Sequence, residues 1–239
     1  MQIIDRTFPT PGENLACDEA LLELSEQGLD GEVLRFWEPK SHFVVLGYSG
    51  RTKSEVRTAS CQKKGIPILR RASGGGTVLQ GPGCLNFALI LKMDGSEALK
   101  NISKTNLFVL ERHKRAMENL MGRKIEIRGH TDLTLGTLKF SGNAQRRRKR
   151  SLLFHGSFLL KMDISLIEEL LPLPERRPAY RGNRSHRDFL INLNLSSRPV
   201  KKALRTIWGA QKPLDSFPRE KVGEWVREKY GSDNWNFKF

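Results

Sequence analysis

Hydrophobic and polar positions repeat along the chain with helical spacing in some segments and strand spacing in others. Residues 103–121 carry apolar side chains on one face and end at a glycine, which predicts a long amphipathic helix. A first helix is predicted after Pro11, with Asn14 as its cap. Residues 197–209 and 216–231 each open with a serine, carry proline in the first turn and end at glycine, so two helices are predicted to close the chain.

Short apolar runs rich in β-branched and aromatic residues predict the strands. The candidates are residues 33–37, 42–47, 66–70, 86–91, 125–128, 133–141 and 152–161. A short helix is predicted from Ile164 to Leu171, followed by an irregular, Arg-rich stretch over residues 173–195. Because strands and helices are mixed without strict β–α–β alternation, we predict an α+β fold with one mixed β-sheet flanked by helices.

Composition places the chain among globular proteins. Hydrophobic residues make up 38% and charged residues 28% of the 239 residues, and we expect residues 1–239 to form a single domain with a sizeable core. No apolar run approaches the length of a membrane span, and the N-terminus lacks the pattern of a secretory signal. The three cysteines, Cys17, Cys61 and Cys84, include no C-x-x-C pair, which argues against a disulfide framework or a zinc site and fits a reducing cytoplasm.

The formal net charge of +15 bears on the choice of partners. A surface this basic attracts anions, whether nucleic acid, phosphates or an acidic protein. Charge alone does not choose among them, and solubility with non-specific attraction is the plainest interpretation. Function therefore has to be inferred from local motifs.

The strongest local motif is a basic, glycine-rich loop between two predicted strands. Its sequence is Arg70-Arg71-Ala72-Ser73-Gly74-Gly75-Gly76-Thr77. Successive glycines let the backbone approach a ligand closely and point its N–H groups at it, and a phosphate is the natural partner of such a loop. The two arginines would add charge-assisted hydrogen bonds. The loop is neither a P-loop nor a dinucleotide fingerprint, and a tight turn with solvated basic flanks is the alternative.

A second motif pairs an aspartate with a lysine. Asp132 ends the stretch Gly129-His130-Thr131-Asp132, and Lys139 begins the stretch Lys139-Phe140-Ser141-Gly142-Asn143-Ala144. A tight hairpin at Gly136 would bring the two charges together. The lysine could then lie against a carboxylate or an α-phosphate, and the aspartate could hold Mg²⁺. A solvent-facing ion pair on a hairpin is the plainer interpretation.

Two further segments have both a plain and a functional interpretation. His155, in the stretch His155-Gly156-Ser157, is either a packed and hydrogen-bonded side chain of an apolar strand or part of a site. The basic run Gln145–Arg150 is either a solvated hairpin tip or a docking surface.

Taken together, these motifs resemble the biotin/lipoate protein ligase family, and its lipoate–protein ligases in particular. That family has an R-R-x-S-G-G-G loop, a G-x-x-D, a K-x-S-G-x-A segment and an H-G strand in this order. The corresponding segments here are Arg70–Gly76, Gly129–Asp132, Lys139–Ala144 and His155-Gly156. The opening Asn14-Leu15-Ala16 also resembles the family's first helix, so the resemblance covers residues 13 to 162 and, more weakly, the closing Trp235-Asn236-Phe237. Each motif is weak alone, but the ordered set is specific.

The resemblance implies a fold of the biotin/lipoate ligase catalytic-domain type. It also implies activation of lipoate by ATP and Mg²⁺ to lipoyl-AMP, and transfer of the lipoyl group to a protein lysine. Lys139 would contact the acyl carboxylate and the adenylate phosphate. The loop from Arg70 to Thr77 would line the lipoyl tunnel and the phosphate side, and Asp132 would face Mg²⁺ or the adenylate. The substrate site would be completed by Ser141, Gly142, Ala144, His155 and Gly156.

The same resemblance implies partners. The acceptors would be the lipoyl domains of 2-oxoacid dehydrogenase complexes or the H protein of glycine cleavage. The C-terminal accessory domain of longer lipoate ligases is absent from residues 1–239, and because some relatives supply it as a separate chain, such a chain is an expected partner. The run Gln145–Arg150 would dock an acidic lipoyl domain. No membrane partner is expected, and a nucleic-acid-binding module is a lesser alternative because no nucleic-acid motif is recognised.

The enzymatic alternative is an octanoyl or lipoyl transferase that works through a cysteine thioester without ATP. One departure from the family pattern makes it relevant: Gln80-Gly81-Pro82-Gly83-Cys84 follows the loop, where the family has an acidic residue and Gly-Asn. A thioester route needs a cysteine that is open to the tunnel and close to positive charge. Cys84 is the cysteine nearest to a motif, and we expect it to be a small buried thiol, which favours the ligase.

Overall fold

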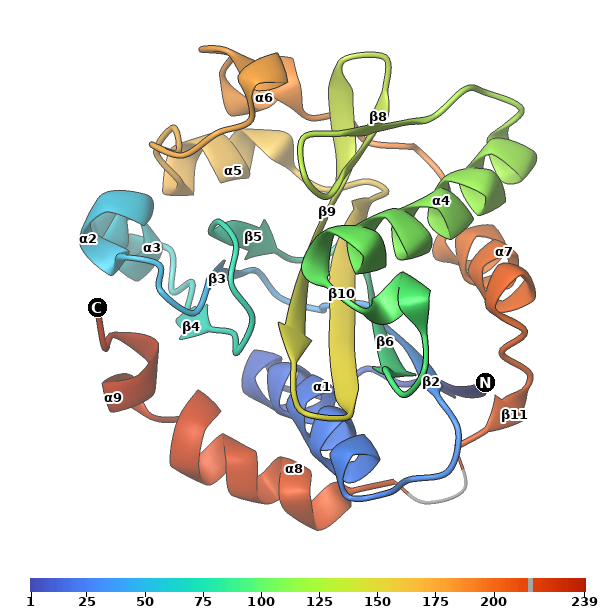
Figure 1. The fold of residues 1–239 in the computed structure, drawn as a ribbon. Helices are drawn as coiled ribbons and strands as arrows, with labels where there is room; N and C mark the ends of the chain where they lie inside the picture. Colours follow the sequence, from blue (N-terminus) through green and yellow to red (C-terminus); the bar gives the residue numbers. More distant parts are fainter. Residues whose placement is uncertain (215–216) are drawn as a thin grey trace.

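An eight-stranded sheet forms the centre of the computed structural model, which describes residues 1–214 and 217–239 (Figure 1). The strand order is β11-β1-β2-β6-β10-β9-β8-β7. The strands are β1 (Gln2–Asp5), β2 (Val33–Trp37), β6 (Cys84–Lys92), β7 (Glu126–Arg128), β8 (Asp132–Leu135), β9 (Leu138–Arg147), β10 (Ser151–Leu159) and β11 (Lys212–Pro213). Strand β1 runs parallel to β2 and β11, and the other neighbouring pairs are antiparallel, so the predicted mixed sheet is confirmed.

A second, three-stranded sheet lies beside the large one, at the left of Figure 1. It contains β3 (Phe43–Leu46), β4 (Ile68–Arg70) and β5 (Val78–Gln80), in the order β4-β3-β5. The glycine-rich loop connects β4 to β5. The sequence pattern predicted neither β5 nor a second sheet, because a strand this short shows no alternation that can be recognised.

Helices cover both faces of the large sheet. They are α1 (Pro11–Glu26), α2 (Thr52–Glu55), α3 (Thr58–Lys63), α4 (Ile102–Met121), α5 (Ile164–Leu170), α6 (His186–Phe189), α7 (Ser197–Trp208), α8 (Arg219–Trp225) and α9 (Asp233–Asn236), with short turns η1 (Glu97–Leu99), η2 (Ala179–Arg181) and η3 (Val226–Tyr230). Helix α4 packs against α7, and α1 packs against α8 (Figure 1). Within the described residues, no helix is both long and apolar enough to cross a membrane.

Strand alternation divides the core between the two faces of the large sheet. On β2, Leu34 and Phe36 join the apolar cluster under α4 and α7, whereas Val33 and Trp37 join the cluster under α1 and α8. Successive side chains of a strand point to opposite faces, so alternate residues belong to different clusters. Strands β6 and β10 divide their apolar residues in the same way. The sheet is therefore buried on both faces.

Most predicted helix ends are observed, but two caps differ. Helix α7 has Ser196 at its N-cap, so Ser197, the predicted cap, is its first helical residue. Helix α1 is capped by Thr10. Its hydroxyl accepts a hydrogen bond from the backbone N–H of Glu13, and the Glu13 carboxylate accepts one from the backbone N–H of Thr10. Asn14, the predicted cap, lies inside the first turn. Helix α4 ends at Gly122 with φ +62°, as predicted. Ser216, predicted to cap the last long helix, lies outside the described residues.

Candidate active site

The floor of the site is a row of residues that crosses the large sheet. Trp37 on β2 pairs with Asn86 on β6, Asn86 with Ser157 on β10, Ser157 with Gly142 on β9, and Gly142 with Asp132 on β8. Residues directly opposite in antiparallel strands point to the same face. All of this row lines one cavity of about 570 Å³, which is in the usual range for a small-molecule site.

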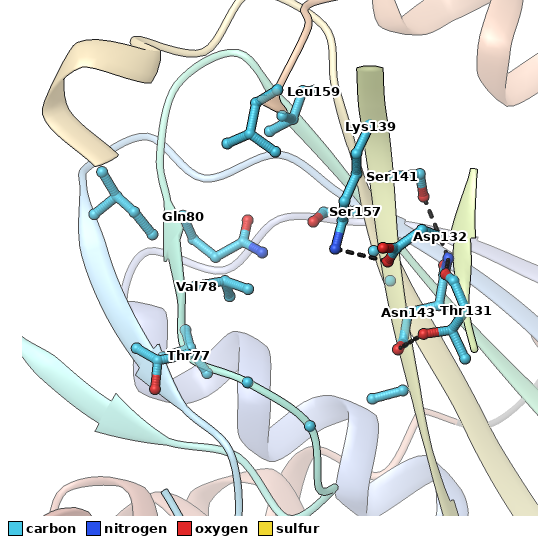
Figure 2. Close-up of a pocket in the computed structure, with 18 of the residues that line it drawn as sticks. Thr77, Val78, Gln80, Thr131, Asp132, Lys139, Ser141, Asn143, Ser157 and Leu159 are labelled. Carbon is cyan, nitrogen blue, oxygen red and sulfur yellow. Dashed lines mark hydrogen bonds and ion pairs between the residues drawn. The ribbon is translucent and has the colours of Figure 1, made fainter. Parts of the chain in front are cut away.

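Three structural units form the walls around this floor: the glycine-rich loop with β5, helix α1, and the segment 171–190. The predicted site residues on the walls and floor are Arg71, Gly75, Gly76, Thr77, Asp132, Lys139, Ser141, Gly142, Ala144, His155 and Gly156. Three other predicted residues, Arg70, Ser73 and Gly74, do not line the cavity. Segments far apart in the sequence thus meet around one space, part of which is drawn in Figure 2.

The aspartate and lysine of the second motif are in contact. Gly136, with φ +59°, opens the short turn between β8 and β9 and has the left-handed conformation that a tight hairpin needs. Lys139 Nζ lies 2.7 Å from Asp132 Oδ1, and the Tyr180 hydroxyl donates to Asp132 Oδ2 at 2.7 Å. The hairpin predicted to bring Asp132 and Lys139 together is confirmed.

The end of the Lys139 side chain lies close to a glycine. The Lys139 side chain extends into the cavity over β9 (Figure 2). A Cβ added at Gly142 would lie 2.8 Å from Lys139 Nζ, closer than real side chains approach. A side chain at Gly142 would therefore displace the flexible end of Lys139 from its present position beside Asp132.

Hydrogen bonds from the Arg71 side chain hold the glycine-rich loop in its conformation. Arg71 donates to the carbonyls of Gly74 at 2.7 Å and Gly76 at 2.9 Å. A Cβ at Gly47 would lie 1.9 Å from the Gly75 oxygen, so the close approach of β3 and the loop requires glycine there. The Gly74 and Gly76 carbonyls are thus occupied by Arg71. No hydrogen bond within the described residues uses the N–H groups of Gly74, Gly75 or Gly76, so these donors are available to a ligand.

Arg70 has a different position from the one that its motif suggested. Its guanidinium is fully buried and donates to the carbonyls of Gly47 at 2.9 Å, Gly50 at 2.7 Å and Asn236 at 3.0 Å. Arg70 thereby ties the C-terminal helix α9 to the foot of the loop. The structure does not place it against a molecule in the cavity.

His155 joins the loop, the sheet and helix α1. Its Nε2 lies 2.6 Å from the Ser73 hydroxyl, and its Nδ1 lies 3.4 Å from Asp18 Oδ2. The Asp18 carboxylate is also ion-paired with the buried Arg35. His155 is therefore packed and hydrogen-bonded, and at the same time it forms part of the cavity wall. The plain and the functional interpretations of this histidine are compatible.

The segment 171–190 supplies site residues that the motifs missed. Arg176, Arg177, Arg181, His186 and Phe189 line the cavity. The sequence showed this stretch to be Arg-rich and irregular but gave no local signal for its position. That position depends on long-range contacts, such as the bond from the Tyr180 hydroxyl to the Asp132 carboxylate, 48 residues away.

All three cysteines are buried away from the cavity. Burial raises the pKa of the Cys17 and Cys84 thiols to about 12, and it also raises the pKa of the Cys61 thiol. Cys84 belongs to an apolar cluster with β3 and α5. The prediction that Cys84 is a small buried thiol is confirmed.

The basic run lies at the far end of β9 from Lys139. Lys139 and Arg146 are seven positions apart, which corresponds to about 23 Å along an extended strand. Arg146 lies over the Tyr48 ring, 5.7 Å from its centroid, beside the glycine-rich loop. Arg147 points elsewhere, because it donates to the Leu99 carbonyl at 2.6 Å and the Thr105 hydroxyl at 3.1 Å. A docking role for this run remains a prediction, and Arg147 has a structural role.

Sequence comparison identifies the family to which the chain belongs. The family model of the lipoyl protein ligase A/B catalytic domain matches residues 10–203, so the chain belongs to that family. It is 27% identical over 266 residues to the octanoyltransferase LipM of Brevibacillus brevis, with 96% of this chain and 95% of that one covered. It is 28% identical over 249 residues to the lipoate-protein ligase A subunit 1 of Thermoplasma acidophilum, with 95% and 93% covered.

Solved structures support the same fold. The chain superposes with a TM-score of 0.85 on a bi-partite lipoate protein ligase of T. acidophilum, a system described with its E2 lipoyl domain; identity is 24%, and 99% of this chain and 95% of that one are covered. A lipoate-protein ligase A bound with ATP gives a TM-score of 0.80 at 23% identity, with 99% of each chain covered. The predicted biotin/lipoate ligase type of fold is confirmed. The relatives include both ligases and transferases, so family membership alone does not choose between the two reactions.

Proposed function

We propose that this chain is a lipoate–protein ligase. It would activate lipoate with ATP to lipoyl-AMP and transfer the lipoyl group to a lysine of an acceptor lipoyl domain. One observation carries the proposal: Lys139 lines the cavity together with Gly75 and Gly76, whose N–H groups have no partner among the described residues, and no cysteine lines it. An ammonium and backbone N–H groups suit a reaction that builds negative charge in the transition state rather than one that needs a thiolate nucleophile.

The proposed reaction has two steps, both within reach of Lys139. A carboxylate oxygen of lipoate attacks the α-phosphorus of ATP, and the bond to pyrophosphate breaks. The amine of the acceptor lysine then attacks the acyl carbon, AMP leaves, and the amine gives up a proton. Both steps concentrate negative charge on oxygens that a fixed ammonium can stabilise. The partly enclosed cavity also keeps water from the mixed anhydride.

Mg²⁺ would be held through Asp132. Mg²⁺ commonly binds one or two protein carboxylates together with substrate phosphates and waters, so a single aspartate facing the cavity fits this role. The described residues contain no cluster of three or more metal-binding side chains. To bind Mg²⁺, the Asp132 carboxylate would have to give up its contact with Lys139 or with Tyr180.

The transferase alternative is supported by the similarity to an octanoyltransferase. Its thioester would need a reactive thiolate. The buried positions of Cys17, Cys61 and Cys84 and their raised thiol pKa values work against it. These observations favour the ligase.

Two partners belong to the proposal. The acceptor would be a lipoyl domain, of a 2-oxoacid dehydrogenase complex or of the glycine cleavage H protein. A separate accessory chain would support the activation step, since a bi-partite ligase is among the structural neighbours and a relative is named as subunit 1 of such an enzyme.

The test is incubation with lipoate, ATP and Mg²⁺, with and without an apo lipoyl domain, read by mass spectrometry. A parallel arm supplies lipoyl-AMP directly, so that transfer can be seen even if activation needs the accessory chain. We expect lipoylation that depends on ATP in the first arm or, if activation needs that chain, lipoylation in the second arm alone. Modification of the acceptor from an acyl thioester donor without ATP, and none from lipoyl-AMP, would contradict the proposal.

A further inference from the structure

One buried arginine of the cavity has neither a counter-ion nor a shell of backbone carbonyls among the described residues. The buried arginines of the described residues are Arg35, Arg70, Arg71 and Arg181. Arg35 is paired with the Asp18 carboxylate, and Arg70 and Arg71 are surrounded by backbone carbonyls. Arg181 differs from all of them. It is 5% exposed and lines the cavity, yet the hydrogen bonding of its side chain within the described residues is limited to one bond, from Nε to the Arg184 carbonyl at 3.2 Å.

The guanidinium of Arg181 keeps unused donors. Its Nη2 is buried without a partner among the described residues. Its flat face lies over the Phe189 ring, 4.5 Å from the centroid. The aromatic face and the Nε bond together fix the plane of the group, so the remaining N–H donors have a defined direction. The group is held rigidly and is not saturated.

The electrostatic surroundings of Arg181 favour an incoming anion. Burial lowers the pKa of Arg181, and the nearby charges of Arg177 and Arg184 lower it further. Asp132 is the carboxylate that acts on it in the opposite direction, but both Asp132 oxygens are already engaged, by Lys139 and by Tyr180. A buried cation in this situation is unfavourable until an anion pairs with it.

The turn that carries Arg181 is placed by its neighbour. Tyr180 and Arg181 are consecutive in η2, and the Tyr180 hydroxyl is bonded to Asp132. Tyr180 is thus a positioning residue, which holds the arginine in the same cavity as the Asp132–Lys139 pair. Of the cationic side chains that line the cavity, Lys139 is paired with a carboxylate, whereas Arg181 has no carboxylate partner among the described residues.

We propose that Arg181 is an anion-binding residue of this cavity and that it takes a phosphate group of the nucleotide. A guanidinium binds phosphate through two parallel hydrogen bonds, and a triphosphate supplies more negative charge than an acyl carboxylate. The donors that were expected at Arg70 and Arg71 are used to build the loop, and Arg181 has the free ones. The naming of ATP as the source of the phosphate rests on the proposed function; the binding of phosphate by Arg181 does not.

Binding measurements by calorimetry test this inference. The probes are ATP, inorganic tripolyphosphate and lipoate, applied to the wild type, Arg181→Gln and Arg187→Gln. Arg187 is the matched control, because it lies in the same segment but is exposed and paired with Glu168. We expect Arg181→Gln to weaken ATP and tripolyphosphate by about tenfold to a hundredfold, as for the loss of hydrogen bonds to a charged group. Lipoate binding should not change, and Arg187→Gln should stay within about twofold of the wild type.

The melting temperature of Arg181→Met separates a binding role from a structural one. An unpaired buried charge stabilises a fold little, so this variant should melt at the same temperature as the wild type or higher. A lower melting temperature with unchanged tripolyphosphate binding would make Arg181 structural and overturn the inference. Wild-type protein that binds neither polyphosphate would overturn it as well.

The outcomes for the inference and for the proposed function are distinguishable. Formation of lipoyl-AMP, together with wild-type ATP affinity in Arg181→Gln, would contradict the inference and support the proposed ligase function. Tripolyphosphate binding through Arg181 without lipoyl-AMP formation, even when the accessory chain is added, would support the inference and contradict the proposed ligase function.

Discussion

The two faces of the large sheet use the same strands for different purposes. Toward α4 and α7, alternate residues of β2, β6 and β10 form an apolar core, and His113 of α4 is buried there without any hydrogen-bond partner among the described residues. Toward α1, part of the other set packs in a second apolar cluster, and Trp37, Asn86 and Ser157 lie on the cavity floor. His155 on the same face is hydrogen-bonded to Ser73 and lies close to Asp18. A shift of one residue in strand register would exchange the two faces. Substitutions on the helix face should therefore change stability, and substitutions on the cavity face should change activity.

The largest effect is expected from Lys139→Ala. This variant removes the ammonium from the cavity, and loss of one group that stabilises charge in the transition state costs about a hundredfold or more in rate. We expect acyl transfer to a lipoyl domain to fall by that amount while the melting temperature stays close to that of the wild type. Lys124→Ala, at a lysine whose side chain is 83% exposed on the sheet edge, is the control. Near-normal turnover of Lys139→Ala would remove this lysine from the reaction.

The two adjacent arginines of the loop should separate stability from binding. Arg70→Met leaves the carbonyls of Gly47 and Gly50 without donors and should lower the free energy of unfolding by about 2–4 kcal/mol. Arg71→Lys loses the fork that holds the Gly74 and Gly76 carbonyls and should raise the KM of a small-molecule substrate by about tenfold. Denaturant titration and steady-state kinetics of both variants check this. Equal effects of the two substitutions on KM would break the distinction.

The face of the large sheet under α4 and α7 should make stability depend on pH, because it contains the buried His113. Burial lowers the pKa of His113 to about 3, whereas the unfolded chain titrates near its ordinary value of about 6.5. Between these values the unfolded state binds more protons, so the free energy of unfolding falls as pH falls, by up to about 1.4 kcal/mol per pH unit from this residue. We expect His113→Leu to flatten the stability curve between about pH 6 and pH 4. A curve parallel to that of the wild type would show that His113 titrates normally.

A smaller effect is expected at the far end of β9. Neutralising Arg146, Arg147 and Arg148 together should slow association with an acidic acceptor domain by several-fold and reduce its salt dependence, as for a surface that steers encounter. Because Arg147 is tied to the Leu99 carbonyl, the pair Arg146 and Arg148 alone should reproduce the effect. Stopped-flow association rates at several ionic strengths check this. Rates that do not change across salt concentrations would show that the run does not steer docking.

The smallest effect is expected from Cys84→Ser. The thiol is buried and raised in pKa, so replacing it should leave activity within about twofold of the wild type once the folded fraction is accounted for. Activity with lipoate as donor should still require ATP and Mg²⁺. An inactive but folded Cys84→Ser variant would favour the transferase.

Much of this molecule could be predicted from local pattern, and the remainder depends on distant contacts. The strands around β2 and β10, helix α4 with its Gly122 end, and the Asp132–Lys139 hairpin each have a signal within a few residues. The Arg70–Asn236 and Tyr180–Asp132 contacts join residues 166 and 48 positions apart, and no local pattern encodes them. For the same reason, the sequence identifies the arginines of the glycine-rich motif, but it does not show which arginines have hydrogen-bond donors without partners.

The exchange of labelled pyrophosphate into ATP tests the central claim most directly. The wild-type protein, with its accessory chain if one is needed, is incubated with ATP, Mg²⁺ and labelled pyrophosphate, and lipoate is added or left out. Reversible formation of lipoyl-AMP predicts exchange that appears only with lipoate and is lost in Lys139→Ala. The absence of lipoate-dependent exchange, together with an acyl group trapped on Cys84 without ATP, would contradict the ligase and identify the transferase.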